Sequence, residues 1–345
     1  MAASSPIDGT APDGVGTDPL GEQVYFLLVL ALVVGVAWRP IAGNPDYGMY
    51  REWYEQGTSL GEYLRSPGLI LERDPGYFAI TSFLRHVGVP FAVFATLFSG
   101  LWAAVKGIQI FRLSNAPLVS LFIYACSFYP LQEWVQMRAG AATGLFLVAL
   151  PLLVEGRRLA YAAIILAAST LQLSALVVLP LVFLGNEGVR PRWYLGALLA
   201  SAAFAATGIR LDFVVHFLAD LSLDPRIAEH AADLVINEPT GTAFNRVSLP
   251  ELLLAVALLL DFEKVRTITP YASHVVRIFA YAQILFFVFV TGVPVFGFRL
   301  AQLVGIVGVL AWALLWALLR GDRLKLAVMG TAGILYLSTS ARLFP

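Results

Sequence analysis

The sequence predicts an all-α, polytopic membrane protein, and three observations carry this prediction. Of its 345 residues, 59% are hydrophobic and only 13% are charged, whereas a typical soluble chain is about 25% charged. The mean hydropathy of +0.76 is correspondingly high. Apolar runs of roughly 15 to 23 residues recur without the alternation of a membrane β-strand. Because lipid cannot hydrogen-bond a bare backbone, such runs must fold as helices.

Charge and cysteine usage exclude several classes of protein. Lysine plus arginine and aspartate plus glutamate each number 23, so the net charge is zero and no basic excess indicates a nucleic-acid partner. The single cysteine, Cys126, lies in an apolar run, which excludes a disulfide framework and a cysteine-based metal site. The sequence also contains no P-loop, serine-hydrolase elbow or dinucleotide fingerprint. We therefore expect no cofactor.

The N-terminus predicts a short tail followed by one transmembrane domain. Residues 1–22 are rich in Gly, Pro, Ala and Asp, and the first twenty contain no Lys or Arg, which is typical of disorder. A cleaved signal peptide would need basic residues before the apolar stretch and a small-residue site after it. We therefore expect an uncleaved first span and a single transmembrane domain over 23–345.

Apolar windows predict the membrane segments in order. Two long polar intervals, 43–88 and 210–248, separate them into groups. The windows, about ten in number, are 23–42, 89–111, 116–132, 138–154, 159–185, 193–209, 249–262, 274–291, 298–319 and 325–341.

Basic residues predict the orientation. The positive-inside rule places short connections rich in basic residues in the cytoplasm. Such connections carry Lys106, Lys264 and Lys325 together with Arg157, Arg158, Arg190, Arg192, Arg266, Arg320 and Arg323. Keeping Arg158 and Arg190 on one side requires that 159–185 be broken or form a hairpin, and polar residues around Gln172 interrupt that run. This predicts about eleven segments, a cytoplasmic N-terminus and two outer loops, 43–88 and 210–248. Ten simple spans are the alternative, and they would scatter the arginines over both sides.

The first outer interval has the residue types of a sugar or phosphate site. If residues 46–56 are helical, Asp46, Tyr50, Trp53 and Tyr54 fall on one face. Aromatic rings can stack on sugar rings while carboxylates bind their hydroxyls. An interfacial helix without a ligand is the alternative, since Trp and Tyr favour the headgroup layer. A second short amphipathic helix is expected over 76–87.

Two arginines at the starts of predicted spans are candidate anion ligands. Arg138 begins the 138–154 window, where the helix dipole disfavours a cation unless an anion is present. That anion could be a substrate phosphate or an internal salt bridge to Glu133. Arg299 opens a later span in the same way, with snorkelling to the headgroups as the alternative.

The second outer interval mixes acids with His216 and His230 but lacks a metal-binding motif, so we predict no metal site. A solvated helix with ion pairs is the simpler interpretation. Arg246, near the end of this interval, is a further candidate for substrate binding.

Several segments together resemble the EpsG family of bacterial exopolysaccharide membrane proteins, which are Wzy-like repeat-unit polymerases. The matching segments, in matching order, are DYGMYREWY, ERDPGYFAITSFLRHVG, QMRAGAATGLFLVAL and LQLSALVVLP. The family commonly has a histidine before the Ser-Ala of the last segment, where this chain has Gln172 and Leu173. Glutamine can orient a hydroxyl or a phosphate, but it cannot accept a proton at neutral pH.

The resemblance implies a glycosyltransferase with GT-C-like architecture in the bacterial cytoplasmic (inner) membrane. Such an O-antigen-polymerase-like enzyme transfers a glycan from undecaprenyl diphosphate to the next lipid-linked repeat unit at the periplasmic or outer face. Its partners would be the undecaprenyl diphosphate-linked oligosaccharide, the bilayer and other polysaccharide assembly proteins. The catalytic candidates are Asp46, Glu72, Asp74 and Arg138, and the substrate-binding candidates are Tyr47, Tyr50, Arg51, Tyr54, Gln172, Arg246 and Arg299.

Two other functions stay open at this point. A transporter or flippase of a lipid-linked sugar or another polar solute would use the break near Gln172 as a midplane binding site. A noncatalytic component of a polysaccharide export complex would need none of the arginines for chemistry.

Overall fold

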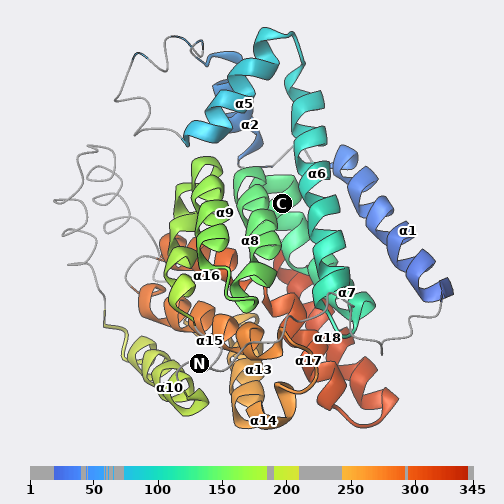
Figure 1. Cartoon of the computed structure of the whole chain (residues 1–345), viewed down its shortest axis with the longest axis vertical. Helices are drawn as coiled ribbons and strands as arrows, with labels where there is room; N and C mark the ends of the chain where they lie inside the picture. The colour runs from blue at the N-terminus through green and yellow to red at the C-terminus, as the bar shows by residue number, and fades with distance from the viewer. Residues whose placement is uncertain are drawn as a thin grey trace, which may run out of the picture.

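The computed structural model confirms an all-α polytopic membrane fold (Figure 1). Helices account for every regular element of the described residues, and there is no strand among them. The predicted tail lies mostly outside these residues and stays a prediction, although α1 already begins at Pro19. The structure describes residues 19–39, 44, 46–57, 59, 61, 65, 74–184, 190–209, 243–291 and 294–340.

Four described helices are long and apolar enough to cross a membrane. They are α1, which runs from Pro19 to Gly35 and continues as the 3-10 helix η1 to Trp38, α6 (Phe91–Leu113), α8 (Met137–Val154) and α15 (Ala272–Phe289). A fifth is formed if α16 (Pro294–Gly305) and α17 (Gly308–Leu318), bent by 56°, are taken as one span.

Shorter helices fill the remaining predicted windows. Helices therefore occupy all ten windows, but several are too short to cross a bilayer of roughly 30 Å, since a helix rises only about 1.5 Å per residue. They are α7 (Pro117–Cys126), α9 (Arg158–Leu171), the 3-10 helix η3 (Leu173–Phe183), α10 (Pro191–Ala206), α13 (Ser248–Leu260) and α14 (Phe262–Val265); the last window holds the longer but less apolar α18 (Asp322–Ser340).

The run over 159–185 is broken, as its polar centre predicts. α9 ends at Leu171, and the backbone of the next residue, Gln172, is extended at φ −155° and ψ 107°. η3 then returns along α9 as the second arm of a hairpin. The hydroxyl of Tyr161 donates to the carbonyl of Val178 at 2.6 Å and ties the two arms together. The hairpin places Arg158 and residue 184 at the same end of the bundle. The membrane side of that end stays a prediction.

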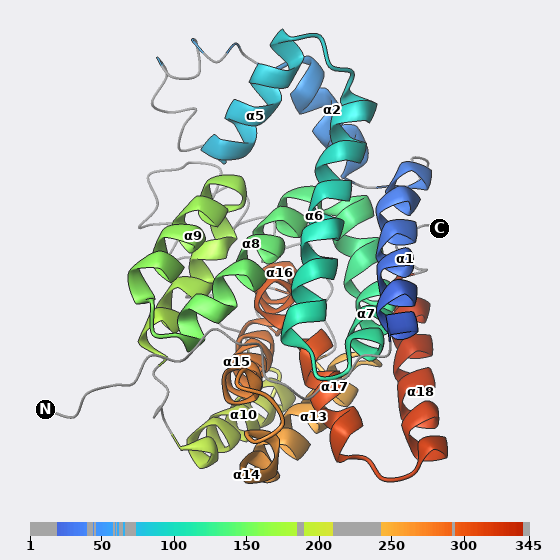
Figure 2. The ribbon, with the colours of Figure 1, turned by 45° about the vertical axis from the view of Figure 1, so that its right-hand side comes forward.

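A layer of two short helices covers the opposite end of the bundle. α2 (Tyr47–Glu55) and α5 (Pro75–His86), both from the first polar interval, lie over the beginning of α6 (Figure 2). Their rings pack against those of Phe91, Phe94 and Phe98 on α6. This aromatic contact fixes the layer to the membrane helices through burial of large apolar surfaces.

A buried ion pair corrects the expected position of Lys106. This residue lies inside α6 rather than in a connection, and its fully buried ammonium pairs with Glu133 of the π-helix η2 (Pro130–Val135). It also donates to Gln132 Oε1 at 2.8 Å, and the hydroxyl of Tyr124 donates to Glu133 at 2.8 Å. Because an unpaired charge in this position would be very costly, the pair and its hydrogen bonds form together. Lys106 therefore contributes no positive charge to a cytoplasmic loop.

Candidate functional site

The site forms where the α2–α5 layer meets the start of α8 and the turn of the α9–η3 hairpin. Asp74, just before α5, forms an ion pair with Arg138 in the first turn of α8, 64 residues away. The other carboxylate oxygen of Asp74 accepts the backbone N–H of Leu173 at 2.8 Å, 99 residues away. Three distant segments thus converge on one carboxylate. The side chains of Arg138 and Asp74 are only 18% and 10% exposed, so water screens the pair weakly.

Three aromatic rings surround the guanidinium group of Arg138. Its central carbon lies 5.4 Å from the ring centre of Tyr50, 5.0 Å from that of Trp53 and 5.8 Å from that of Tyr77. Each distance is within the range of a cation–π interaction. Arg138 Nε also lies 3.5 Å from the hydroxyl of Tyr50. Arg138 is therefore a cation held in a fixed position, as a ligand for an anion requires.

The local sequence around Asp74 explains how the carboxylate reaches this point. Pro75 follows Asp74 at the first position of α5, where proline is well accommodated. Gly76 comes next, and a Cβ placed there would lie 2.3 Å from Thr170 Oγ1 at the end of α9. Only glycine permits this close approach. The Asp-Pro-Gly sequence therefore brings α5 directly against the hairpin.

Asp46 and Arg299 extend the site electrostatically. Burial raises the pKa of the Asp46 carboxyl, and the positive charges of Arg299 and Arg138 partly oppose that rise. Burial likewise raises the pKa of Asp74, against the lowering effects of Arg138 and the Leu173 N–H. Arg299 itself is exposed on α16. Two carboxylates and two arginines thus act on the same region.

The alternative in which Glu133 is the internal partner of Arg138 is wrong, because Glu133 is buried against Lys106. The acid that pairs with Arg138 is Asp74. The sequence placed Trp53 on the aromatic face of α2, but it did not predict that Trp53 and Tyr77 would lie against the guanidinium. Their helical spacing was visible, but which buried group they would meet depends on how α2, α5 and α8 pack.

Three residues predicted to bind substrate lie elsewhere on α2. Tyr54 is buried, stacks on Phe94 and donates to the carbonyl of Val89 at 2.7 Å. Tyr47 packs edge-on against Phe91. Arg51 is exposed and pairs with Glu55 one helical turn away at 2.7 Å. None of these contacts reaches Arg138, so the predicted roles of Tyr47, Arg51 and Tyr54 in substrate binding gain no geometric support.

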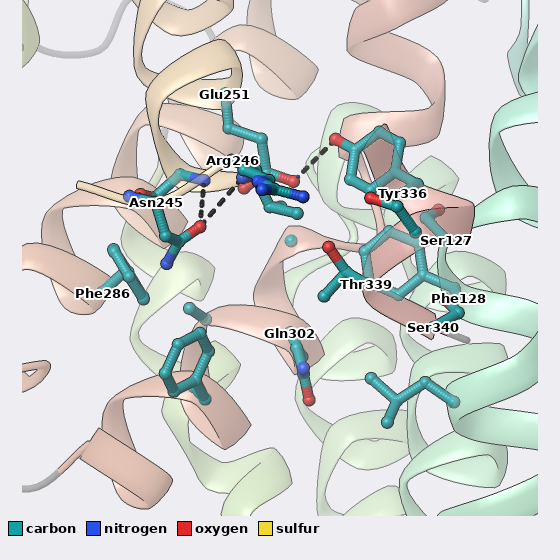
Figure 3. Close-up of a pocket in the computed structure, with 17 residues that line it drawn as sticks. Ser127, Phe128, Asn245, Arg246, Glu251, Phe286, Gln302, Tyr336, Thr339 and Ser340 are labelled. Atoms are coloured by element: carbon teal, nitrogen blue, oxygen red, sulfur yellow. Dashed lines mark hydrogen bonds between the residues drawn. The ribbon is translucent and has the colours of Figure 1, made fainter. Parts of the chain in front are cut away.

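The remaining candidates are divided between the site, a second cavity and an undescribed segment. Gln172 lies at the hairpin turn beside Leu173, and its amide nitrogen is 3.2 Å from the hydroxyl of Ser174. Arg246 precedes α13 and lines a separate cavity (Figure 3). Glu72 lies outside the described residues, so its role stays a prediction.

Comparison with known proteins gives one clear match. A family model described as the EpsG family matches residues 23–344, nearly the whole chain. No curated protein and no solved structure matches the chain. Every residue of the site described above lies within the matched region.

Proposed function

The chain belongs to the EpsG family, and from this premise we propose that it polymerises lipid-linked oligosaccharide repeat units at the outer face of the bacterial cytoplasmic membrane. The family implies a role in polysaccharide assembly at a membrane. The finer proposal is transfer of a growing glycan from undecaprenyl diphosphate to the sugar of the next repeat unit. The single observation that carries it is the fixed guanidinium of Arg138, set between an acid and three aromatic rings.

The proposed reaction needs a cation that stabilises a leaving diphosphate. The bond between the anomeric carbon and the diphosphate oxygen breaks, and its electron pair leaves on that oxygen. A preorganised guanidinium in a weakly screened site lowers the energy of this charge far more than one in water does. Arg138 has that environment, and Arg299 supplies a second positive charge nearby.

The reaction also needs a group that accepts the proton of the attacking hydroxyl. Both oxygens of Asp74 already accept hydrogen bonds, one from Arg138 and one from Leu173, so we assign Asp74 to positioning Arg138. Asp46 is the better candidate for the base. Burial raises the pKa of its carboxyl and thereby makes it a stronger proton acceptor than an ordinary aspartate.

The position of the hairpin turn favours an enzyme over a transporter. A transporter would use the break at Gln172 as a binding site at the membrane midplane. Instead, the turn lies against the α2–α5 layer, because Leu173 bonds to Asp74 and Thr170 contacts Gly76. Among the described residues, the polar groups at this break belong to the same end of the bundle as Arg138.

The test is the length distribution of cell polysaccharide when Arg138→Ala replaces the wild-type protein at equal membrane abundance. We expect long chains to disappear and single lipid-linked repeats to accumulate on the outer leaflet. Arg138→Lys should restore little, because a lysine ammonium lacks the planar geometry that the three rings surround. Arg51→Ala, which removes an exposed arginine of the same layer, is the matched control.

Two other results would contradict the proposal. Repeats that accumulate on the cytoplasmic leaflet would indicate a flippase, since the substrate would then fail to cross. Unchanged polymer with Arg138→Ala would indicate a noncatalytic component of the assembly machinery.

A further inference from the structure

A second cavity lies between the helices, with an apolar lining that carries a few polar groups, and the proposed reaction at Arg138 does not use it. Its volume is about 510 Å³, within the range of roughly 300 to 1,000 Å³ that is usual for small-ligand sites. The segment after α7, the start of α13, one side of α16 and the end of α18 line it, together with Phe286 of α15 (Figure 3).

Hydrogen bonds from two neighbouring side chains orient one carboxylate that lines this cavity. Glu251, in the first turn of α13, accepts a hydrogen bond from Tyr336 at 2.8 Å on one oxygen and from Gln283 at 2.9 Å on the other. Trp312 donates to the hydroxyl of Tyr336 at 3.1 Å, which fixes that hydroxyl as a donor to Glu251. A carboxylate has about four acceptor positions, so about two remain for groups within the cavity that Glu251 lines.

Placing a carboxylate in an apolar helix costs free energy, because the charged group loses its hydration. α13 is otherwise almost entirely apolar, and an ionisable group in such a segment usually marks a functional site. The hydrogen bonds from Gln283 and Tyr336 offset part of the cost. The remaining acceptor positions can accept hydrogen bonds from a ligand with several hydroxyl groups.

Other lining residues add uncharged polar groups and aromatic rings. Gln302 on α16 and Thr339 on α18 add an amide and a hydroxyl to the lining (Figure 3). Phe286 and Phe298 form an aromatic wall, with ring centres 5.1 Å apart. A carboxylate, an amide and a hydroxyl opposite aromatic rings can together bind the hydroxyls and the apolar face of a sugar ring.

A metal ion fits this cavity poorly. Among the residues that the structure describes, no three His, Cys, Asp or Glu side chains lie close enough together to hold one. An acyl or prenyl chain would make no use of the polar groups of Glu251, Gln302 and Thr339 that line the cavity. A saccharide is the ligand class that satisfies the lining.

We infer that this cavity binds a sugar unit of the oligosaccharide substrate, through Glu251, Gln302 and Thr339. The inference rests on the proposed polymerase function and assigns the substrate a second binding site. Helix α16 connects the two sites, because Phe298 and Gln302 line the cavity while the charge of the intervening Arg299 acts on Asp46. A polymerase must bind two glycans at once. Arg138 is proposed to bind the diphosphate of one of them, so the other glycan needs a second binding site.

The experiment measures binding of the free repeat-unit oligosaccharide, released by mild acid from the host's own polysaccharide, to the full-length protein in lipid nanodiscs. Ala301 lines the cavity, so Ala301→Trp fills it, and we expect binding at least tenfold weaker than that of wild type. Ala197→Trp is the matched control, since Ala197 lies on the exposed face of α10. Gln302→Leu removes one hydrogen-bonding group with little change in volume and should weaken binding about fivefold.

The outcomes separate this inference from the proposed function. Arg138→Ala should bind the free oligosaccharide as wild type does, because this probe carries no diphosphate. If Ala301→Trp and Gln302→Leu both bind like wild type, the cavity is not the sugar site, whatever Arg138→Ala does to the polymer. If Ala301→Trp abolishes binding while Arg138→Ala makes normal polymer, the cavity inference stands and the polymerase proposal fails. If Ala301→Trp does not assemble, Gln302→Leu decides alone.

Discussion

Gly76 should be essential because it sets the distance between α5 and the hairpin. In Gly76→Ala, the added Cβ would lie 2.3 Å from Thr170 Oγ1 and 2.9 Å from Thr170 Cβ. Carbon atoms in ordinary van der Waals contact lie 3.4–4 Å from their neighbours. Thr170 cannot simply rotate away, because its hydroxyl donates to the carbonyl of Ala167 at 2.7 Å and its Cβ is fixed to the helix.

The magnitude follows from the displacement that the clash requires. The start of α5 and the end of α9 must separate by about 1 Å, and Asp74, two residues before Gly76, moves with α5. That shift stretches the 2.8 Å hydrogen bond from Leu173 and displaces Arg138 with its ion-pair partner. A 1 Å displacement of a catalytic group costs up to about 10²-fold in rate. The overpacking itself costs about 1–3 kcal/mol of folding stability.

The assay is polymer synthesis by purified protein supplied with lipid-linked repeat units, with membrane abundance measured in parallel. Gly48→Ala is the control, since a Cβ at Gly48 on α2 meets nothing within 4 Å. Thr170→Gly removes both close side-chain atoms, so Gly76→Ala combined with Thr170→Gly should recover most of the activity. Wild-type activity in Gly76→Ala alone, with Thr170 intact, would refute the reasoning.

Three further predictions concern single groups. Lys106→Met should lower the free energy of unfolding by about 3–5 kcal/mol, because it leaves Glu133 buried without its cation. Thermal unfolding in detergent measures this loss, and Lys106→Met combined with Glu133→Leu should recover much of it. If Asp46 is the base, the polymerisation rate should fall on acidification, because protonation removes the base. Because burial raises the pKa of the Asp46 carboxyl, the midpoint of this fall should lie above the ordinary aspartate pKa of about 3.9. A pH–rate profile that is unchanged in Asp46→Asn would oppose this role. Arg51→Ala should leave polymer length and abundance unchanged, since Arg51 forms only an exposed pair with Glu55, and a shortened polymer would count against its surface role.

Local features of the sequence were sufficient to predict the helical segments and the break. Apolar runs indicate helices wherever a chain lies in lipid, so the windows and the observed helices coincide. The break at Gln172 was predictable because several polar side chains cannot lie unpaired in one continuous apolar helix. Arg138 was identifiable by its position at a helix N-terminus, which requires a nearby anion. Each of these inferences depends on residues within a few turns of one another.

The partners of the charged residues depend on tertiary packing, and the sequence could not predict them. Glu133 is five residues from Arg138 and was the obvious partner, but the π-helix η2 turns it toward α6 and Lys106. Lys106 was expected in a loop because it lies near the end of an apolar window, yet α6 continues to Leu113 and buries it. Arg138 instead pairs with Asp74, which lies 64 residues away in the sequence. The close approach of α5 to α9 at Gly76 brings Asp74 within reach of Arg138.

The Lys106–Glu133 and Arg138–Asp74 ion pairs therefore have different roles, and their surroundings show the difference. Lys106 and Glu133 are fully buried, and their hydrogen-bonding partners come from the protein, as in a pair that stabilises the packing of η2 against α6. Arg138 and Asp74 keep some exposure, and the aromatic rings around Arg138 hold the guanidinium independently of the acid. A cation with two separate supports can exchange one anionic partner for another without losing its position. That property suits a group that must receive a diphosphate and release it in every catalytic cycle.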